Sequence, residues 1–121
     1  SDKLMQAAQV RADEMAASGA YSHTRPDGRK YTTVTDCKYV GENIHRIADW
    51  ALQGKPVSEV AMWSWNHSAG HQNNLLDKSY AEIGVGLARG VNEDGYECWY
   101  CVQLFLWNGY SVSWVDAPAA K

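Results

Sequence analysis

The sequence predicts an α+β fold, in which helices pack against an antiparallel sheet. Apolar residues with helical spacing fill the first part of the chain, and alternating apolar segments joined by a turn fill its last third. With 121 residues, of which 45% are hydrophobic and 21% charged, the chain is large enough for one core. We therefore expect a single domain over residues 1–121.

The first predicted element is a helix from Asp2 to about Ser18. Small and apolar residues recur there at helical spacing, namely Leu4, Ala8, Ala12, Met15 and Ala16. Arg11, Asp13 and Glu14 fall between these positions, so we expect them on other faces of the helix. The pair Ser18-Gly19 supplies a stop, because glycine is common just after a helix.

A tight turn is expected between His23 and Gly28, in the segment His-Thr-Arg-Pro-Asp-Gly. Pro26 presets its own backbone angle, and Asp27-Gly28 tolerates the left-handed region. The turn would hold His23 on a rigid loop.

The middle of the chain is mixed, with a short helix predicted from Glu42 to about Ala51 and a break at Gly54-Lys-Pro56. A firmer helix follows, because one face with helical spacing is formed by Val57, Val60, Ala61, Trp63 and either Ser64 or Trp65. Ser58 is available as its cap, and Gly70 should end or bend it. His71 would then lie just beyond the helix.

The last third predicts a β-hairpin. Ile83, Val85 and Leu87 alternate along one strand, Tyr96–Trp107 forms a longer apolar strand, and Asn92–Gly95 supplies the turn. Gly84 and Gly86 do not precede a helix, so close backbone packing is favoured over a nucleotide-binding loop. A short final strand is expected at residues 110–114, before a loose Ala/Pro tail.

Charge and hydropathy exclude several classes of function. The net charge is −3, the pI is about 5.7, and no block of Lys or Arg occurs, so a nucleic-acid partner or an anionic membrane surface is not expected. No run of about 18 apolar residues is present, which predicts no transmembrane segment. Ser1 does not open a signal peptide, so any secretion signal is expected to have been removed already.

Three cysteines allow at most one intramolecular disulfide. Cys98 and Cys101 are three residues apart on a predicted strand and should point to opposite faces, which disfavours a bond between them and favours Cys37 as the partner of either. Their spacing superficially matches a redox motif, but that chemistry uses a helix N-terminus to lower the thiol pKa. A zinc ribbon would require a second cysteine pair, which is missing.

Two histidines and one glutamate have the settings of functional residues. His23 lies on the Pro-Asp-Gly loop, and His71 lies between Gly70 and a run of amides, so each backbone can project its side chain into a cleft. Glu42 follows Gly41, and a carboxylate near two imidazoles can hold their tautomers or accept a proton. His45 and His67 have no such setting.

These residues belong to a series of short motifs that resembles the CAP superfamily (cysteine-rich secretory protein, antigen 5, pathogenesis-related 1), and in particular its bacterial domains. The motifs are Ser22–Gly28, Gly41–Ile44, Trp65–His71 with the following residues to Leu76, Ile83–Gly86 and Tyr100–Phe105. They keep the family's order and cover about residues 4 to 107. Any one of them is a weak pattern, but five in order make a chance resemblance improbable.

The resemblance implies a three-layer α-β-α sandwich, usually exported, with a His/Glu cleft that in some members binds zinc. His23, Glu42 and His71 match the family's positions, whereas Ser68 stands where the eukaryotic pattern has a second glutamate. The family's additional N-terminal helix is missing or truncated in this sequence. An exposed apolar patch is therefore an expectation as well.

Two functions of different class follow. In the first, the chain is a secreted or cell-surface binding module, with His23 and His71 as candidate zinc ligands and a peptide, lipid or glycan as ligand. In the second, it is a metal-assisted hydrolase that uses the same histidines, with Glu42 as the base. A third hypothesis is that His23, Glu42 and His71 form a purely structural hydrogen-bond network that binds no metal and catalyses no reaction. The sequence leaves the ligand, catalysis and the oligomeric state open.

Overall fold

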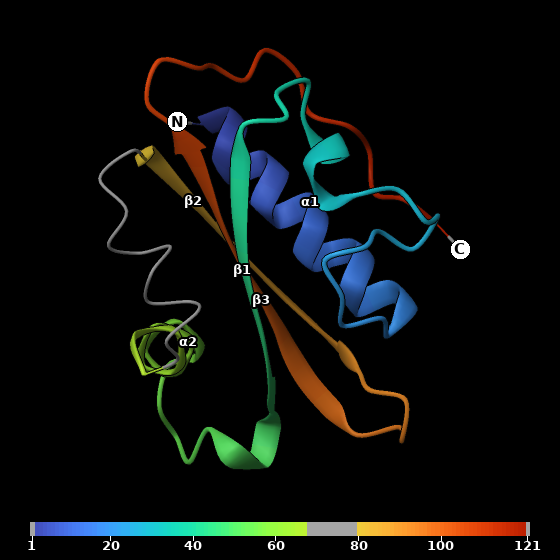
Figure 1. Ribbon diagram of the computed structural model, residues 1–121. Coiled ribbons are helices and arrows are strands. Elements are labelled where there is room, and N and C mark those ends of the chain that lie inside the picture. Colours follow the sequence, from blue (N-terminus) through green and yellow to red (C-terminus); the bar gives the residue numbers. More distant parts are fainter. Residues whose placement is uncertain (1, 68–79, 121) are drawn as a thin grey trace.

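The computed structural model describes residues 2–67 and 80–120, and it confirms the α+β fold (Figure 1). The helices are α1 (Asp2–Ser18) and α2 (Val57–Asn66), with the short 3-10 helices η1 (Tyr31–Val34) and η2 (Asp49–Ala51). The strands are β1 (Val40–Ala48), β2 (Tyr80–Val91) and β3 (Glu97–Trp107), and they form an antiparallel sheet in the order β1-β3-β2. None of the helices in this described part is long and apolar enough to cross a bilayer.

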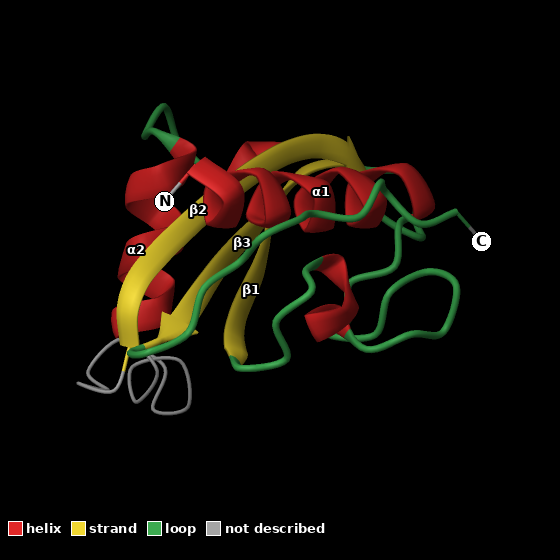
Figure 2. Ribbon diagram, turned by 90° about the horizontal axis from the view of Figure 1, so that it is seen from above, coloured by secondary structure: helices red, strands yellow, loops and turns green. Residues whose placement is uncertain are grey.

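The two α-helices cover opposite faces of the sheet, so the fold has three layers (Figures 1 and 2). Even-numbered residues of β3, such as Tyr100, Val102 and Leu104, join the buried cluster that contains α1. Cys101, between them, belongs instead to the cluster of α2 with Ala61 and Trp65. Side chains alternate between the faces of a strand, which explains why neighbours in β3 serve different cores.

Helix α1 lies unusually close to β2, because three glycines face it. A Cβ added to Gly84 would lie 2.5 Å from the Leu4 carbonyl oxygen, and one on Gly90 would lie 2.5 Å from that of Ala16. A Cβ on Gly86 would overlap the backbone of Ala8. The prediction of close backbone packing at Gly84 and Gly86 is therefore confirmed, and Gly90 shows the same contact.

Side chains of α1 also occupy the outer edge of β2. The Gln9 amide binds both backbone groups of Leu87, donating to its oxygen at 2.8 Å and accepting from its nitrogen at 3.2 Å. The Met5 sulfur accepts from the Val85 nitrogen at 3.3 Å. At the other edge of the sheet, the Ile44 oxygen accepts from the Trp65 indole and the Tyr21 hydroxyl, each at 3.2 Å.

The predicted hairpin and first helix are confirmed. Ile83 pairs with Phe105 and Leu87 with Cys101, and the Asn92 side chain closes the turn by accepting from the Asp94 and Tyr96 nitrogens. Helix α1 ends at Ser18, after which the Gly19 nitrogen donates to the Met15 oxygen at 2.8 Å.

The short helix predicted from Glu42 to Ala51 is wrong. Residues to Ala48 form β1, and only Asp49–Ala51 make a helical turn. Glu42 and Asn43 are both buried in the sheet, where Arg11 and Gln103 bind them, so the strand shows no simple alternation of apolar and polar residues in the sequence. The Ser58 cap is also wrong, since Pro56 holds the cap position without a side-chain hydrogen bond. Helix α2 ends at Asn66, and Gly70 lies outside the described residues.

The expectations for the C-terminal segment are wrong as well. No strand forms at residues 110–114, and only an isolated bridge joins Thr35 to Val115. The tail is tied rather than loose, because the Asp116 nitrogen donates to the Val34 oxygen and the Ala119 nitrogen to the Glu14 carboxylate. Figure 1 shows this segment returning past α1.

The cysteines are all free thiols, so the expected disulfide with Cys37 is not formed. Cys37 comes three residues before Val40, which pairs with Leu106, whereas Cys98 pairs with Ala48 at the opposite end of the sheet. Cys98 and Cys101 do face opposite cores, as predicted. Burial, helped by the nearby Cys98, raises the pKa of Cys101 to about 12, so its thiol stays protonated at neutral pH.

Candidate functional site

The candidate site is built around Glu42, whose position on β1 directs it to the α1 side of the sheet. Its side chain is fully buried, and the Arg11 guanidinium of α1 binds it in a bidentate manner. The Arg11 Nε lies 2.7 Å from Oε2 and Nη2 lies 3.1 Å from Oε1. Such a fork fixes the carboxylate in one orientation.

His23 is the third member of this group and lies at the protein surface. Its Nδ1 lies 2.8 Å from the Glu42 Oε1, and 54% of its side chain is exposed. A carboxylate only accepts hydrogen bonds, so Nδ1 must be the donor, and in the neutral imidazole Nε2 then carries the lone pair. Within the part of the chain that the structure describes, Nε2 has no hydrogen-bond partner.

The loop around His23 is held as the sequence predicted. The Gly28 nitrogen donates to the Arg25 oxygen at 2.9 Å, and the Tyr31 nitrogen donates to the His23 oxygen at 3.0 Å. The Tyr31 ring lies 5.9 Å from the imidazole and limits its movement on one side. A rigid turn therefore positions the His23 side chain over Glu42.

A buried ionic network extends from Glu42 into the molecule, and the sequence reasoning missed it. Arg11 also binds Glu14 at 2.8 Å and the Ser22 oxygen at 2.6 Å, and Arg25 binds the other side of Glu14. Arg11, Glu14 and Arg25 are at most 1% exposed. Of the three charged residues predicted on faces of the helix other than the apolar one, Asp13 is exposed, whereas Arg11 and Glu14 are buried. Burial alone would lower the pKa of Arg11, but the hydrogen bonds and charges of Glu42 and Glu14 raise it.

The network ends at the C-terminal segment. Arg25 and Arg29 each donate to the Asp116 Oδ2 at 3.0 Å, and Arg25 also donates to the Ala117 oxygen. Hydrogen bonds from the two guanidiniums lower the pKa of the Asp116 carboxyl. The loop that bears His23 is thus anchored to both α1 and the tail.

Of the other histidines, the structure describes only His45 and His67, and neither belongs to this site. His71 lies outside the described residues. His45 occupies the α2 side of β1, and the His67 ring stacks on Trp63 with centroids 4.0 Å apart. Among residues 2–67 and 80–120, no group of three or more His, Cys, Asp or Glu side chains is arranged to hold a metal ion.

The arrangement separates two roles that the sequence left open for Glu42. Both of its oxygens are engaged, by Arg11 and by His23, so the carboxylate orients the imidazole and has no free position facing solvent. Among the described residues, His23 is therefore the member of the pair that reaches the surface, with Nε2 left without a hydrogen-bond partner.

Among solved structures, the chain is similar to an outer surface protein from Borrelia burgdorferi. The two share 15% sequence identity with a TM-score of 0.53, and the match covers 89% of this chain and 76% of that chain, which shows similarity of fold. Comparison with curated protein sequences gives no significant match. The model of the cysteine-rich secretory protein family, CAP, matches residues 1–105, and the chain therefore belongs to the CAP family.

Proposed function

We propose that this chain is an extracellular CAP binding module whose His23–Glu42 site takes up a divalent metal ion, with zinc as the candidate. Its ligand would be a peptide, a lipid or a glycan. The family's description as secretory and the neighbour's description as an outer surface protein support a location outside the cell or on its surface.

The observation that carries the proposal is the geometry of His23. Histidines that bind metals commonly donate their other ring N–H to a carboxylate, which fixes the tautomer and orients the ring. The Nδ1 contact with buried Glu42 has this form, and Nε2 faces outward on a half-exposed side chain. The donor set suits zinc, which accepts neutral imidazole nitrogen readily.

His71 is proposed as the second protein ligand, from its place in the family motifs. Two histidines fall one short of the three protein ligands usual in catalytic zinc sites, so water or a bound ligand would complete the coordination. The affinity should accordingly be modest. It should also fall in acid, because protons compete for neutral imidazoles.

Hydrolysis with Glu42 as base is less well supported. A general base needs a lone pair within reach of the proton it abstracts, and the Glu42 oxygens are held by Arg11 and His23 behind the imidazole. If hydrolysis occurs at this site, His23 would have to move the proton and Glu42 would be a positioning residue.

Calorimetric titration of zinc into the metal-free protein tests the proposal. We expect saturable binding at about pH 7.5 that is lost at about pH 5.5, where imidazoles become protonated. His23→Ala and His71→Ala should each abolish it, whereas His67→Ala, which removes another exposed imidazole, should leave it unchanged. Equal binding by His23→Ala and the parent protein would refute the site and favour a purely structural network.

A further inference from the structure

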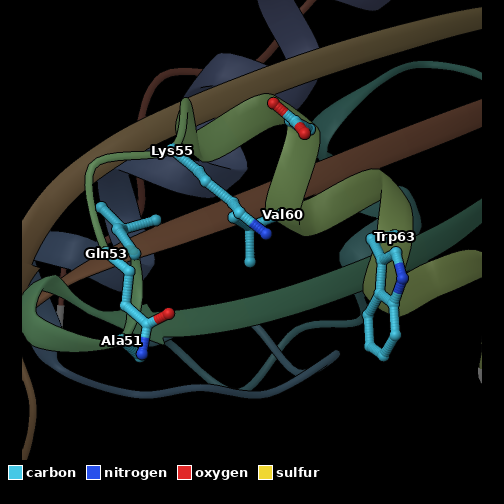
Figure 3. A pocket seen from close by; sticks show the side chains of 7 residues that line it. Ala51, Gln53, Lys55, Val60 and Trp63 are labelled. Carbon is cyan, nitrogen blue, oxygen red and sulfur yellow. The ribbon is translucent and has the colours of Figure 1, made fainter.

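A second candidate site lies on the other side of the sheet, between η2 and α2. A cavity of about 250 Å³ is lined there by Ala51, Leu52, Gln53, Lys55, Glu59, Val60 and Trp63 (Figure 3). It contains none of the residues of the His23–Glu42 site, which faces α1. This volume is below the range of about 300–1,000 Å³ usual for sites of drug-sized ligands, so it suits a smaller ring.

The aromatic wall of this cavity is Trp63, which presents its ring to solvent. Trp63 and Glu59 are four residues apart and share the face of α2 that points away from the sheet, since Ala61 and Trp65 point into it. Trp63 is 61% exposed, whereas Trp65 on the same helix is 1% exposed. Burying the Trp63 ring against a ligand would remove a large apolar surface from water.

The Trp63 ring is also held in place before any ligand arrives. The His67 imidazole stacks on it with an interplanar angle of 16°, and the His67 Nδ1 lies 2.7 Å from the Trp63 oxygen. One face of the indole is therefore supported by the residue that caps α2. A preorganised ring loses less conformational entropy on binding than a free one.

The cavity also has a polar lining, from Gln53 and Lys55 in the segment between η2 and α2 and from Glu59 on α2 itself. The side chains of Gln53, Lys55 and Glu59 form no hydrogen bond or ion pair within the described residues. Figure 3 shows Gln53 and Lys55 on one side of Val60 and Trp63 on the other. An amide, a cation and an anion around an apolar floor provide both donors and acceptors, with no net charge for a ligand to match.

The backbone at Gln53 adds an independent observation. Its φ is 51°, and it is the one non-glycine residue with positive φ among the described residues. This conformation costs about 1 kcal/mol for a side-chain-bearing residue. Gly54 follows directly, so the chain keeps a glutamine at the strained position of the cavity wall, and such strain is concentrated at functional sites.

We propose that this cavity, which we call the Trp63 pocket, binds a neutral pyranose ring of a glycan. A hexose with equatorial hydroxyls has C–H groups on its faces and hydroxyls on its edge. The C–H groups would pack on the negative face of the indole, and the hydroxyls would bind Gln53, Lys55 and Glu59. An aliphatic chain would leave these three polar groups without partners, and an ionised ligand would meet a like charge at Lys55 or Glu59.

Titration of the ¹⁵N-labelled full chain with cellotriose, a neutral β-linked glucose trimer, tests the proposal. We expect the Trp63 indole resonance, identified by its loss in Trp63→Phe, to shift in a saturable manner, with weak affinity in the millimolar range. Trp63→Ala should weaken binding about tenfold or more, by analogy with the cost of losing one stacked aromatic partner. Gln53→Gly should also weaken it, although this change relieves the backbone strain and should not destabilise the fold.

Matched control variants distinguish binding at the Trp63 pocket from nonspecific binding to exposed aromatic rings. Trp114→Ala removes another exposed indole, 51% exposed on the C-terminal segment, and should leave binding unchanged. The Trp65 indole, which donates to the Ile44 oxygen, reports that every variant is folded. Shifts of equal size at Trp50, Trp63 and Trp114, or none at Trp63, would overturn the proposal. His23→Ala should have no effect, so this proposal and the metal site can fail separately.

Discussion

The two faces of the sheet are built in different ways. On the α1 side, a 17-residue helix approaches β2 through glycines, and a fully buried ionic network joins helix, strand, loop and tail. On the α2 side, a 10-residue helix contributes two buried residues, Ala61 and Trp65, and carries the exposed Trp63 ring. The difference suggests that the α1 side provides most of the rigidity, and that the α2 side has surface available for recognition.

The first way to test this contrast is to replace Arg11 by methionine. The change keeps apolar bulk but leaves Glu42 and Glu14 buried without their shared cation, which should cost about 3 to 5 kcal/mol of unfolding free energy. Urea unfolding at neutral pH measures it. Arg46→Met, which breaks a more exposed pair with Glu93, is the control and should cost about 1 kcal/mol or less. Equal costs would contradict the contrast.

The close approach of α1 to β2 predicts the next effect. Gly86→Val would force the backbone of Ala8 away from the strand and should cost about 3 kcal/mol or more. Gly95→Ala provides a comparison, because its φ of 83° strains a side chain but nothing lies within 4 Å of the added Cβ. It should cost about 1 kcal/mol. A Gly86→Val protein with an unchanged melting temperature would show that α1 packs more loosely than the structure indicates.

Acid should weaken the α1 side through Asp116. Its pKa is lowered in the folded protein by the hydrogen bonds of Arg25 and Arg29, so its stabilising contribution is present above the unfolded pKa and is lost as pH falls through the folded one. Asp116→Asn should cost about 1 kcal/mol near pH 7. The difference from the parent protein should shrink below about pH 4. A difference that does not vary with pH would indicate that the asparagine disturbs packing instead.

The smallest effect on stability is expected on the α2 side, for Trp63→Ala. Since the ring is largely exposed, its loss should change the free energy of unfolding by about 0.5 kcal/mol or less. Trp65→Ala, two residues along the same helix, removes a buried ring and its hydrogen bond and should cost about 3 kcal/mol. Similar losses for both would mean that the Trp63 ring is a structural element and that its availability for a ligand is limited.

Sequence reasoning succeeded where local signals agree. The hairpin combined alternation with an Asn-to-Gly turn, and α1 combined helical spacing with a Ser-Gly stop, so both could be placed without tertiary information. The His23 turn was equally local. The family motifs then related Glu42 to His23, and the structure places these two side chains in contact.

It failed where the partners are distant in the sequence. Arg11 and Glu14 look like outward charges of an amphipathic helix, and only contacts with Ser22, Arg25 and Glu42 make their burial favourable. The burial of Glu42 has the same cause, and it removed from β1 the alternation of apolar and polar residues that predicts a strand. A signal was available in the i, i+3 spacing of Arg11 and Glu14 together with Arg25 in the turn, but it requires the fold to be interpreted. The position of His71 relative to His23 remains a prediction.

The Gln9 amide that holds Leu87 has a consequence for the behaviour of the protein at high concentration. An outer strand with free backbone groups offers a template on which a second chain can form intermolecular β-structure. By presenting one carbonyl and one N–H to the strand, Gln9 imitates a neighbouring strand for a single residue, and Met5 occupies the next outward N–H. Helix α1 therefore protects the edge of β2 from pairing with a second chain. If α1 detached while the sheet stayed folded, this edge would be exposed and could nucleate fibril growth.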